Sequence, residues 1–376
     1  MSNQGESSGP DQITGPMTPA FGRGCTTDLL GPLLGVDDGA ALPARFPASG
    51  PRVLFVLDGL GWQQLQERPH LTPTLSAMAG GPITTVAPST TATALTSITT
   101  ALTPAEHGIV GYRMVVDGQV LNTLRWATPS NPDARSVIPP AVLQPYAPFL
   151  GRSPALVTKA EFRLSGFSEA HLRGGRLIGY RTPAVLVHET ARLLRSGEEV
   201  VYAYYEGIDK VAHEYGLEST YDAELAFVDR LVADMLDAVP SGTTMLVTAD
   251  HGQVDCRHGS IPIDPDVLVN CTGLSGEGRF RWLHAGPDRL ADVVAAAEEA
   301  HGDRAWIRTI EQMLDERWFG IGMSPGVRER LGDVALLPFD PISFDDPDDT
   351  GPFELVGRHG SLTPAEMLVP CLVASA

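Results

Sequence analysis

The chain has 376 residues, 43% of them hydrophobic, which allows a large apolar core and argues against global disorder. Its 27 lysine and arginine residues against 46 aspartate and glutamate residues give a net charge of −19, which disfavours general binding to nucleic acids or anionic membranes. An anionic substrate therefore needs a local cation, from a metal or a basic pocket.

Residues 1–20 are polar and rich in glycine, proline and serine, so we predict a disordered tail there. They contain no basic segment followed by an apolar run, and no apolar stretch in the chain reaches the length of a membrane span. The four cysteines include no Cys-x-x-Cys pair, which disfavours thiolate zinc sites. We therefore expect a cytoplasmic protein with reduced cysteines.

Three short apolar runs each end in an acidic residue. They are predicted strands, with the sequences "RVLFVLDGLG" (52–61), "EEVVYAYYEGID" (198–209) and "TTMLVTADHG" (243–252). Another strand is predicted over 154–160 and a last one near residue 370, while helical patterns fall between the strands, over 89–103, 182–197 and 219–239. This alternation predicts an α/β fold with a largely parallel sheet.

Residues 260–345 interrupt the alternation. They combine short strands, an acidic loop and two predicted helices, over 288–302 and 306–320. We predict that they form a cap subdomain inserted into one domain of residues 21–376.

Nine threonines crowd residues 84–103, where the pattern predicts a strand end followed by a helix. A threonine at the start of such a helix can point its hydroxyl at a metal, and the helix N-terminus stabilises the negative charge that develops there. For most of the others we expect packing or hydrogen bonds to the carbonyl four residues earlier.

Three aspartates and three histidines fall where the carboxyl ends of parallel strands should meet. Each alone could be a turn cap or a surface histidine, but together they predict two metal sites with oxygen and nitrogen ligands. This ligand set suits Zn²⁺, with Mn²⁺ as the alternative, and two divalent ions over three carboxylates leave a net positive site that can accept a phosphoryl group. The six residues are Asp58, Asp209, His213, Asp250, His251 and His359.

Five segments resemble the alkaline phosphatase superfamily and, within it, the type I phosphodiesterase/nucleotide pyrophosphatase family. They are "VLFVLDGLGW", "APSTTATALTSITTALTPAEHGIVGY", "YYEGIDKVAHEYG", "LVTADHGQ" and "GRHGSLTPAEMLVPCLV". The resemblance implies an α/β/α sandwich with a largely parallel central sheet, an inserted cap and two zinc sites.

The resemblance also implies roles for these residues. Asp58, Asp250 and His251 would hold the ion that contacts the nucleophile, and Asp209, His213 and His359 the second ion. The family's P-x-x-T pattern implies that Thr91 is the nucleophile and a further ligand of the first ion, with Thr90 as the alternative.

The sequence departs from the family pattern after Thr91. Many diesterases of the family have Phe-Pro-Asn there, whereas this chain has Ala92-Thr93-Ala94, so the asparagine that would bind a phosphate oxygen is absent. We name Lys159 and Tyr205 as candidate substrate contacts in its place; a solvated surface lysine is the alternative for Lys159. His107 and His258 lie near the motifs, but we expect them to be outside the ligand set.

The predicted function is a two-metal hydrolase of phosphodiester or phosphoanhydride bonds that works through a phospho-threonine intermediate. Its partner would be a small-molecule phosphate ester, with a nucleotide as one candidate; no nucleic-acid polymer and no membrane is expected. The alternatives are a phosphomonoesterase or a phosphonate hydrolase that uses Lys159, and a zinc-binding scaffold without activity.

Overall fold

The structure, a computed structural model, describes residues 15–47, 49–349 and 354–376. Residues 1–14 of the predicted tail lie outside the described residues, whereas the Met17 amide donates a hydrogen bond to the Leu362 carbonyl at 2.8 Å. Among the helices of the described ranges, none is both long enough and apolar enough to cross a lipid bilayer.

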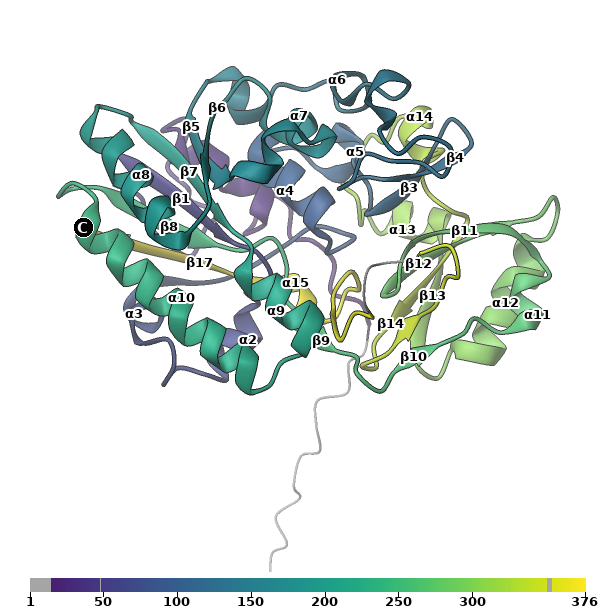
Figure 1. Ribbon diagram of the computed structural model, residues 1–376. Helices are drawn as coiled ribbons and strands as arrows, with labels where there is room; N and C mark the ends of the chain where they lie inside the picture. Colours follow the sequence, from purple (N-terminus) through teal and green to yellow (C-terminus); the bar gives the residue numbers. More distant parts are fainter. Residues whose placement is uncertain (1–14, 48, 350–353) are drawn as a thin grey trace, which may run out of the picture.

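A seven-stranded sheet forms the centre of the larger part of the molecule (Figure 1). Its last strand in the chain, β17 (Leu368–Ser375), is antiparallel to both of its neighbours, and the other neighbouring pairs are parallel. The prediction of an α/β fold with a largely parallel sheet is therefore confirmed. The strand order is β2 (Ala79–Thr84), β17, β8 (Thr244–Thr248), β1 (Arg52–Leu57), β7 (Val200–Tyr205), β5 (Ala155–Lys159) and β6 (Arg176–Tyr180).

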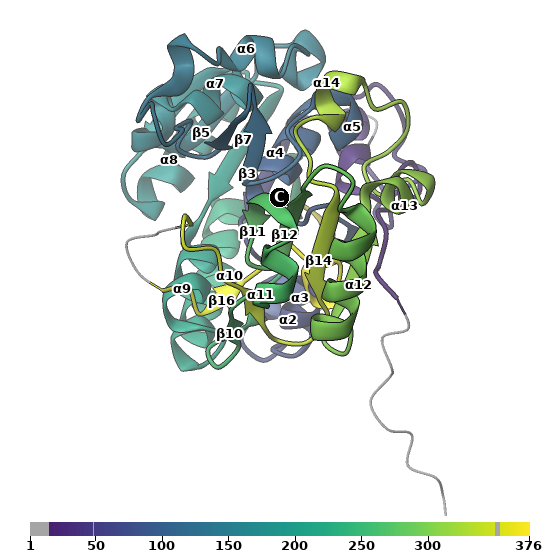
Figure 2. The ribbon, with the colours of Figure 1, turned by 90° about the vertical axis from the view of Figure 1, so that its right-hand side faces the viewer.

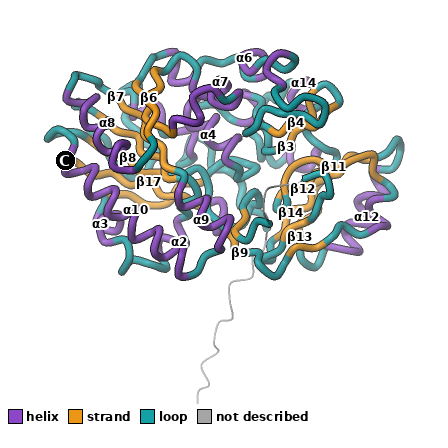
Figure 3. Tube along the Cα trace, in the orientation of Figure 1, coloured by secondary structure: helices purple, strands orange, loops and turns teal. Residues whose placement is uncertain are grey.

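Helices cover both faces of this sheet (Figure 3). Side chains alternate along a strand, so Tyr204 and Tyr205 of β7 face opposite sides. On the Tyr204 side lie α4 (Thr91–Thr100) and α7 (Gly166–Leu172), and on the Tyr205 side lie α8 (Pro183–Arg195) and α10 (Ser219–Ala238). The shorter elements around them are η1 (Thr26–Asp28), α1 (Leu30–Leu33), α2 (Trp62–Gln66), α3 (Pro73–Ala77), α5 (Pro104–His107), β3 (Arg113–Val116), β4 (Gln119–Asn122), η2 (Ala134–Ser136), α6 (Pro140–Leu143), η3 (Pro148–Gly151), η4 (Ala160–Leu164), α9 (Gly207–Tyr215), β9 (Val254–Asp255), β16 (Gly357–Arg358) and α15 (Pro364–Met367).

The threonine-rich segment forms α4, whose ten residues are all buried. The hydroxyls of Thr96, Thr99 and Thr100 donate to the carbonyls four residues earlier, at 2.7, 2.9 and 2.7 Å. Because these hydroxyls make hydrogen bonds to carbonyls of their own helix, the helix can lie in the core without leaving them unpaired. The expectation for most of these threonines is confirmed for these three.

The segment 260–345, called the cap below, contains a second sheet with antiparallel neighbours (Figure 2). One of its faces packs against α11 (Pro265–Leu268) and α12 (Leu290–His301), and the other sends Trp282 and Leu337 into the main core. The two ends of the cap meet, because β10 (Ser260–Ile261) pairs with β15 (Ser343–Phe344). The domain boundaries themselves stay a prediction. The strand order is β11 (Cys271–Glu277), β12 (Phe280–Ala285), β14 (Val334–Pro338) and β13 (Ala305–Thr309).

The predicted helix over 306–320 is wrong in its first part. Residues 305–309 form β13, and the chain becomes helical in α13 (Ile310–Asp315), followed later by α14 (Pro325–Arg328). Trp306 and Ile307 point to opposite faces of the cap sheet, one into each core. Thr309 then starts α13, since its hydroxyl accepts a hydrogen bond from the Gln312 amide at 3.3 Å.

Candidate active site

The six predicted ligands lie together at the carboxyl edge of the main sheet. Asp58 directly follows β1, and the pair Asp250 and His251 follows β8, its neighbour on one side. Asp209 and His213 lie on α9, which follows β7, the neighbour on the other side. Parallel strands thus bring side chains far apart in the sequence to one edge.

The six side chains form two groups, and within each group the potential ligand atoms lie within 4.8 Å of one another. The first group is Asp58, Asp250 and His251, and the second group is Asp209, His213 and His359. The rings of His251 and His359 stack with their centroids 3.5 Å apart, so the two groups are adjacent. This is the grouping that the family resemblance implies.

In all three histidines the Nδ1 atom lies next to a backbone carbonyl. The distances are 3.0 Å from His251 to Gly252, 2.7 Å from His213 to Gly357 and 2.9 Å from His359 to Ser89. A carbonyl can only accept a hydrogen bond, so Nδ1 carries the proton and each Nε2 keeps a lone pair for a metal.

The first group leaves two carboxylate oxygens free. Oδ1 of Asp58 and Oδ2 of Asp250 are buried and find no hydrogen-bond partner among the described residues, and they lie 3.4 and 3.5 Å from Nε2 of His251. Burial and the negative charge of Asp250 raise the pKa of Asp58 well above its ordinary value. Two buried carboxylates with unpartnered oxygens beside an imidazole nitrogen fit a divalent cation.

Thr91 is the first residue of α4, and its Oγ1 lies 3.1 Å from Nε2 of His251. The residue before it, Thr90, holds the N-cap position of α4, but its side chain accepts no hydrogen bond from the helix amides. Its hydroxyl lies instead 3.4 Å from Oε2 of Glu277, a residue of the cap. Of the two candidate nucleophiles, Thr91 is therefore the one whose hydroxyl contacts the first group.

A buried ion pair supports the loop that carries His359. The guanidinium of Arg279, in the turn between β11 and β12, contacts both carboxylate oxygens of Glu366 on α15, at 2.6 and 2.8 Å. Glu366 also accepts a hydrogen bond from the Ser361 amide at 2.9 Å, and the Ser361 carbonyl accepts one from the Ser89 hydroxyl at 2.7 Å. The cap is thus connected to the loops that hold His359 and Thr91.

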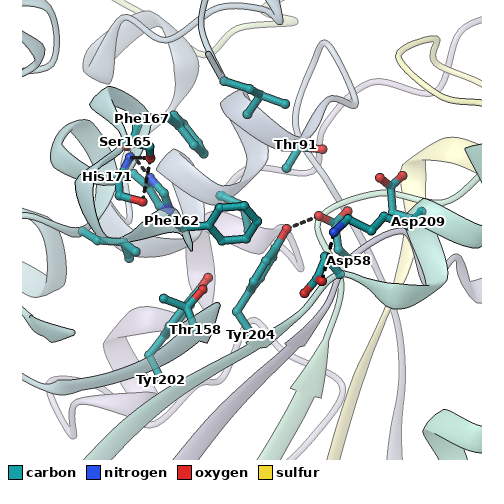
Figure 4. Close-up of a pocket in the computed structure, with 16 residues that line it drawn as sticks. Asp58, Thr91, Thr158, Phe162, Ser165, Phe167, His171, Tyr202, Tyr204 and Asp209 are labelled. Carbon is teal, nitrogen blue, oxygen red and sulfur yellow. Dashed lines mark hydrogen bonds and ion pairs between the residues drawn. The ribbon is translucent and has the colours of Figure 1, made fainter. Parts of the chain in front are cut away.

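Two contacts to the ligand carboxylates were not predicted. The amide of Gln253 donates to Oδ1 of Asp209 at 2.6 Å, and the hydroxyl of Tyr204 donates to Oδ2 of Asp58 (Figure 4). Gln253 follows the Asp-His-Gly motif directly, so its place in the sequence could have pointed to it. No comparable signal distinguishes Tyr204 from its neighbours on β7.

Two cavities adjoin the site, and Thr91, Leu124 and Asp209 line both of them. The aromatic pocket, of about 230 Å³, lies between α4, α7 and β7, and its walls include Phe162, Phe167, Tyr202, Tyr204 and Leu95 (Figure 4). The cap-side cleft, of about 740 Å³, includes Tyr112, Arg125, Glu277 and Arg358. The nucleophile candidate therefore stands at the junction of two cavities.

Neither of the two predicted substrate contacts lines the aromatic pocket or the cap-side cleft. Nζ of Lys159 lies 2.5 Å from Oε1 of Glu206, which neutralises its charge. Tyr205 lines neither cavity, because it points to the opposite face of the sheet and donates to Oε1 of Glu224 at 2.7 Å. The structure brings neither of them to Thr91.

His107 and His258 lie outside the two groups, as expected. His258 is exposed. His107 is buried: its Nδ1 accepts from the Ile109 amide at 3.1 Å, and its Nε2 lies 2.8 Å from the Ser97 hydroxyl. Burial, with the nearby charge of Arg330, lowers the pKa of His107 to about 3.

Lowering the pH from 7 to 5 is expected to reduce the free energy of unfolding through His107. The unfolded chain binds a proton there near pH 6.5 and the folded chain near pH 3, so the unfolded state holds more protons between these values. Each pH unit in that window costs about 1.4 kcal/mol. Urea denaturation at pH 7 and pH 5 measures this. Between the two pH values, the free energy of unfolding of His107→Gln should fall by roughly 2 kcal/mol less than that of the wild type. That of His258→Gln should fall as much as that of the wild type. An equal loss in all three proteins would contradict this.

Comparison with known proteins gives one family. Residues 52–362 match the profile of the type I phosphodiesterase / nucleotide pyrophosphatase family. A search of curated protein sequences finds no match.

Solved structures share the fold at low sequence identity. Murine ectonucleotide pyrophosphatase / phosphodiesterase 5 is 13% identical with a TM-score of 0.65, over 87% of this chain and 88% of that one. An inactive threonine-to-alanine variant of the murine protein, in complex with AMP, is 14% identical with a TM-score of 0.64, over 86% of this chain and 87% of that one. Phosphonoacetate hydrolase from Sinorhizobium meliloti 1021, in complex with phosphonoacetate, is 19% identical with a TM-score of 0.61, over 88% of this chain and 91% of that one.

Proposed function

Because the chain belongs to the type I phosphodiesterase / nucleotide pyrophosphatase family of the alkaline phosphatase superfamily, we propose that it hydrolyses a small-molecule phosphodiester or phosphoanhydride with Thr91 as the nucleophile. The observation that carries this proposal is the place of Thr91, 3.1 Å from His251 and at the junction of the aromatic pocket and the cap-side cleft. A diester carries two substituents on phosphorus, and a cavity on each side of the nucleophile gives room for both.

The reaction needs two displacements at phosphorus. In the first, Oγ1 of Thr91 forms a bond to phosphorus and the bond to the leaving oxygen breaks. The proton of the Thr91 hydroxyl ends on the leaving oxygen. In the second, water attacks phosphorus, the bond to Oγ1 breaks, and a proton of that water ends on Oγ1, which restores the threonine. The start of α4 places its first amides beside the phosphoryl group, where they stabilise negative charge. The AMP complex of an inactive threonine-to-alanine variant of the murine protein supports this role for a threonine.

The first group and the second group would each hold one divalent ion, Zn²⁺ being the first choice for these donors. When bound, the ions supply the positive charge that offsets the charge of the phosphoryl group. The chain's own contribution is to fix the donors: backbone carbonyls orient the three imidazoles, and Gln253 orients Asp209.

The monoesterase and phosphonate-hydrolase alternatives need an additional cation, because their substrates carry more negative charge. Lys159 was the candidate, and Glu206 neutralises it at 2.5 Å. Lys210, which lines the aromatic pocket, lies 3.3 Å from the same carboxylate. Glu206 and Glu161 together pair with these two lysines, so the aromatic pocket supplies no extra cation. Arg125 and Arg358 line the cap-side cleft, so the comparison of substrates below decides between these alternatives, and the fold is shared with a phosphonoacetate hydrolase.

The test is to compare kcat/KM of the zinc-loaded protein for bis-p-nitrophenyl phosphate, the p-nitrophenyl ester of thymidine 5′-monophosphate, p-nitrophenyl phosphate and phosphonoacetate. We expect the diesters to exceed the other two by at least about tenfold, which is ~1.4 kcal/mol of transition-state stabilisation. Faster turnover of the monoester or of phosphonoacetate would overturn the proposal in favour of that activity. No turnover of any of the four would favour the inactive scaffold.

A pocket variant adds a matched control to this comparison. Phe162 lines the aromatic pocket from η4, so Phe162→Ala should lower kcat/KM for the diesters by roughly tenfold. Leu164 lies on the same segment and is 79% exposed, so Leu164→Ala should leave kcat/KM unchanged. Equal effects of the two substitutions would contradict a substrate contact in this pocket.

A further inference from the structure

We propose that Tyr204 is a positioning residue for the first ion: its hydroxyl fixes Asp58 so that this carboxylate offers one oxygen to the ion. The inference rests on the proposed function insofar as it takes the first group to be an ion site. It concerns a residue outside the predicted ligand set, and it assigns to it a measurable share of the affinity for one of the two ions.

The register of the sheet brings the two side chains together. β1 and β7 are parallel neighbours, with Val56 opposite Tyr204, and Asp58 follows two residues later at the carboxyl edge. Tyr204 is 6% exposed and Asp58 is 2% exposed. The phenol extends along its strand towards that edge and donates to Oδ2 of Asp58 (Figure 4). The contact is thus built from core residues and is shielded from solvent.

Because of this hydroxyl, the two oxygens of Asp58 have different surroundings. Oδ2 accepts the phenol hydrogen bond, while Oδ1 is buried, lacks a partner within the described ranges and lies 3.4 Å from Nε2 of His251. Without the hydroxyl, neither oxygen would have a donor, and the carboxylate could rotate or present both oxygens to the ion. The phenol therefore selects a single oxygen and its direction.

Asp250 is arranged in the same way by different donors. Its Oδ1 accepts from the backbone amides of Gly59 and His251, both at 3.1 Å, and its Oδ2 stays free for the ion. Both aspartates of the first group thus use one oxygen for the protein and one for the site. For Asp250 the backbone supplies the donors, and for Asp58 a side chain does. The contact to Asp58 can consequently be removed by one substitution that leaves the backbone intact.

The ring of Tyr204 also lines the aromatic pocket, beside Tyr202. A phenylalanine at this position would keep the pocket wall and remove the hydroxyl alone. Tyr202 offers a matched control, since it lies on the same face of β7, lines the same pocket and is 1% exposed. Its hydroxyl makes no hydrogen bond to the residues that the structure describes, so Tyr202→Phe removes an equal group without touching Asp58.

The experiment is a Zn²⁺ titration of the metal-free full chain by competition with a chromophoric chelator, for the wild type, Tyr204→Phe and Tyr202→Phe. We expect Tyr204→Phe to raise the Kd of one ion by about 10- to 100-fold and to leave the other unchanged, whereas Tyr202→Phe should match the wild type at both. Wild-type affinity of Tyr204→Phe for both ions would overturn the proposal, and so would an equal loss in Tyr202→Phe, which would indicate a packing effect.

A second measurement separates positioning from pocket packing. With Zn²⁺ in excess, Tyr204→Phe should show a lower kcat for bis-p-nitrophenyl phosphate and an unchanged KM, because the ring that contacts the substrate is retained. A raised KM with unchanged kcat would overturn the proposal. The titration uses no substrate, so a wild-type chain that binds two ions but hydrolyses no diester would refute the proposed function and leave this inference standing.

Discussion

Replacement of Thr91 by alanine is expected to lower the rate of diester hydrolysis by at least about a thousandfold. The substitution removes the hydroxyl that lies 3.1 Å from His251, and with it the atom that would attack phosphorus. Alanine suits the first turn of a helix, so α4 should remain folded. The measurement is kcat/KM for bis-p-nitrophenyl phosphate, together with the number of zinc ions bound, which should stay at the wild-type value.

Thr90→Ala is the matched control, because it removes a neighbouring hydroxyl that faces Glu277 of the cap. It should retain most of the activity. Mass spectrometry of acid-quenched wild-type protein should detect phosphate on Thr91 during turnover. Near-normal activity of Thr91→Ala, or loss of activity in Thr90→Ala alone, would move the nucleophile to another residue.

Replacement of Arg279 by methionine is expected to lower the free energy of unfolding by about 3–5 kcal/mol. Arg279 and Glu366 are both fully buried, and the substitution leaves the carboxylate of Glu366 without its counter-charge. It also removes the donor of hydrogen bonds to the carbonyls of Pro338 and Ile342 in the cap. Urea denaturation measures the loss.

Two further variants test the cause of that loss. Adding Glu366→Gln to Arg279→Met removes the unpaired charge, so the double variant should be more stable than Arg279→Met alone. Arg257→Met breaks a pair with Asp255 at the surface and should change stability far less. A double variant that is less stable than Arg279→Met would mean that the hydrogen bonds the Glu366 carboxylate accepts from Ser361 and Thr363 outweigh the cost of its unpaired charge.

Much of the candidate site could be predicted because its ligands follow strands. Asp58, Asp250 and His251 come directly after short apolar runs, and the rule that parallel strands end at one edge gathers them without further information. Asp209 and His213 are four residues apart, which places both on one face of a helix. His359 is different, because it lies in a loop after the cap, and its assignment to the second ion was implied by the family resemblance alone.

The substrate side could not be predicted from strand patterns. β7 is buried on both faces, so its sequence "VVYAYY" shows no alternation of apolar and polar residues that would tell which tyrosine faces the site. Tyr205 was named as a substrate contact, but it faces Glu224 on the other side of the sheet, and it is Tyr204 that lines the aromatic pocket. Lys159 does end a strand, but the carboxylate that neutralises it, Glu206, follows a different strand. Charge pairing between strands depends on the register of the sheet and is not readable along the chain.

The same ambiguity explains the error in the cap. The segment "WIRTI" is apolar and β-branched, and short runs of this kind suit a strand or a buried helix equally. Its pairing with β14 decides the outcome, because Trp306 and Ile307 each find a core on one side of that sheet. Only the tertiary context supplies this second strand.

The place of β17 bears on how the protein forms during translation. β2 ends at Thr84, and its ladder partner in the sheet begins at Leu368. β8 also has β17 as its neighbour on one side, and Asp250 and His251 lie just beyond the end of β8. A ribosome therefore synthesises residues 85–367 before β2 gains this neighbour, and open strand edges can recruit other chains. The edge of the sheet that carries Asp250 and His251 is thus completed only once β17 has been synthesised.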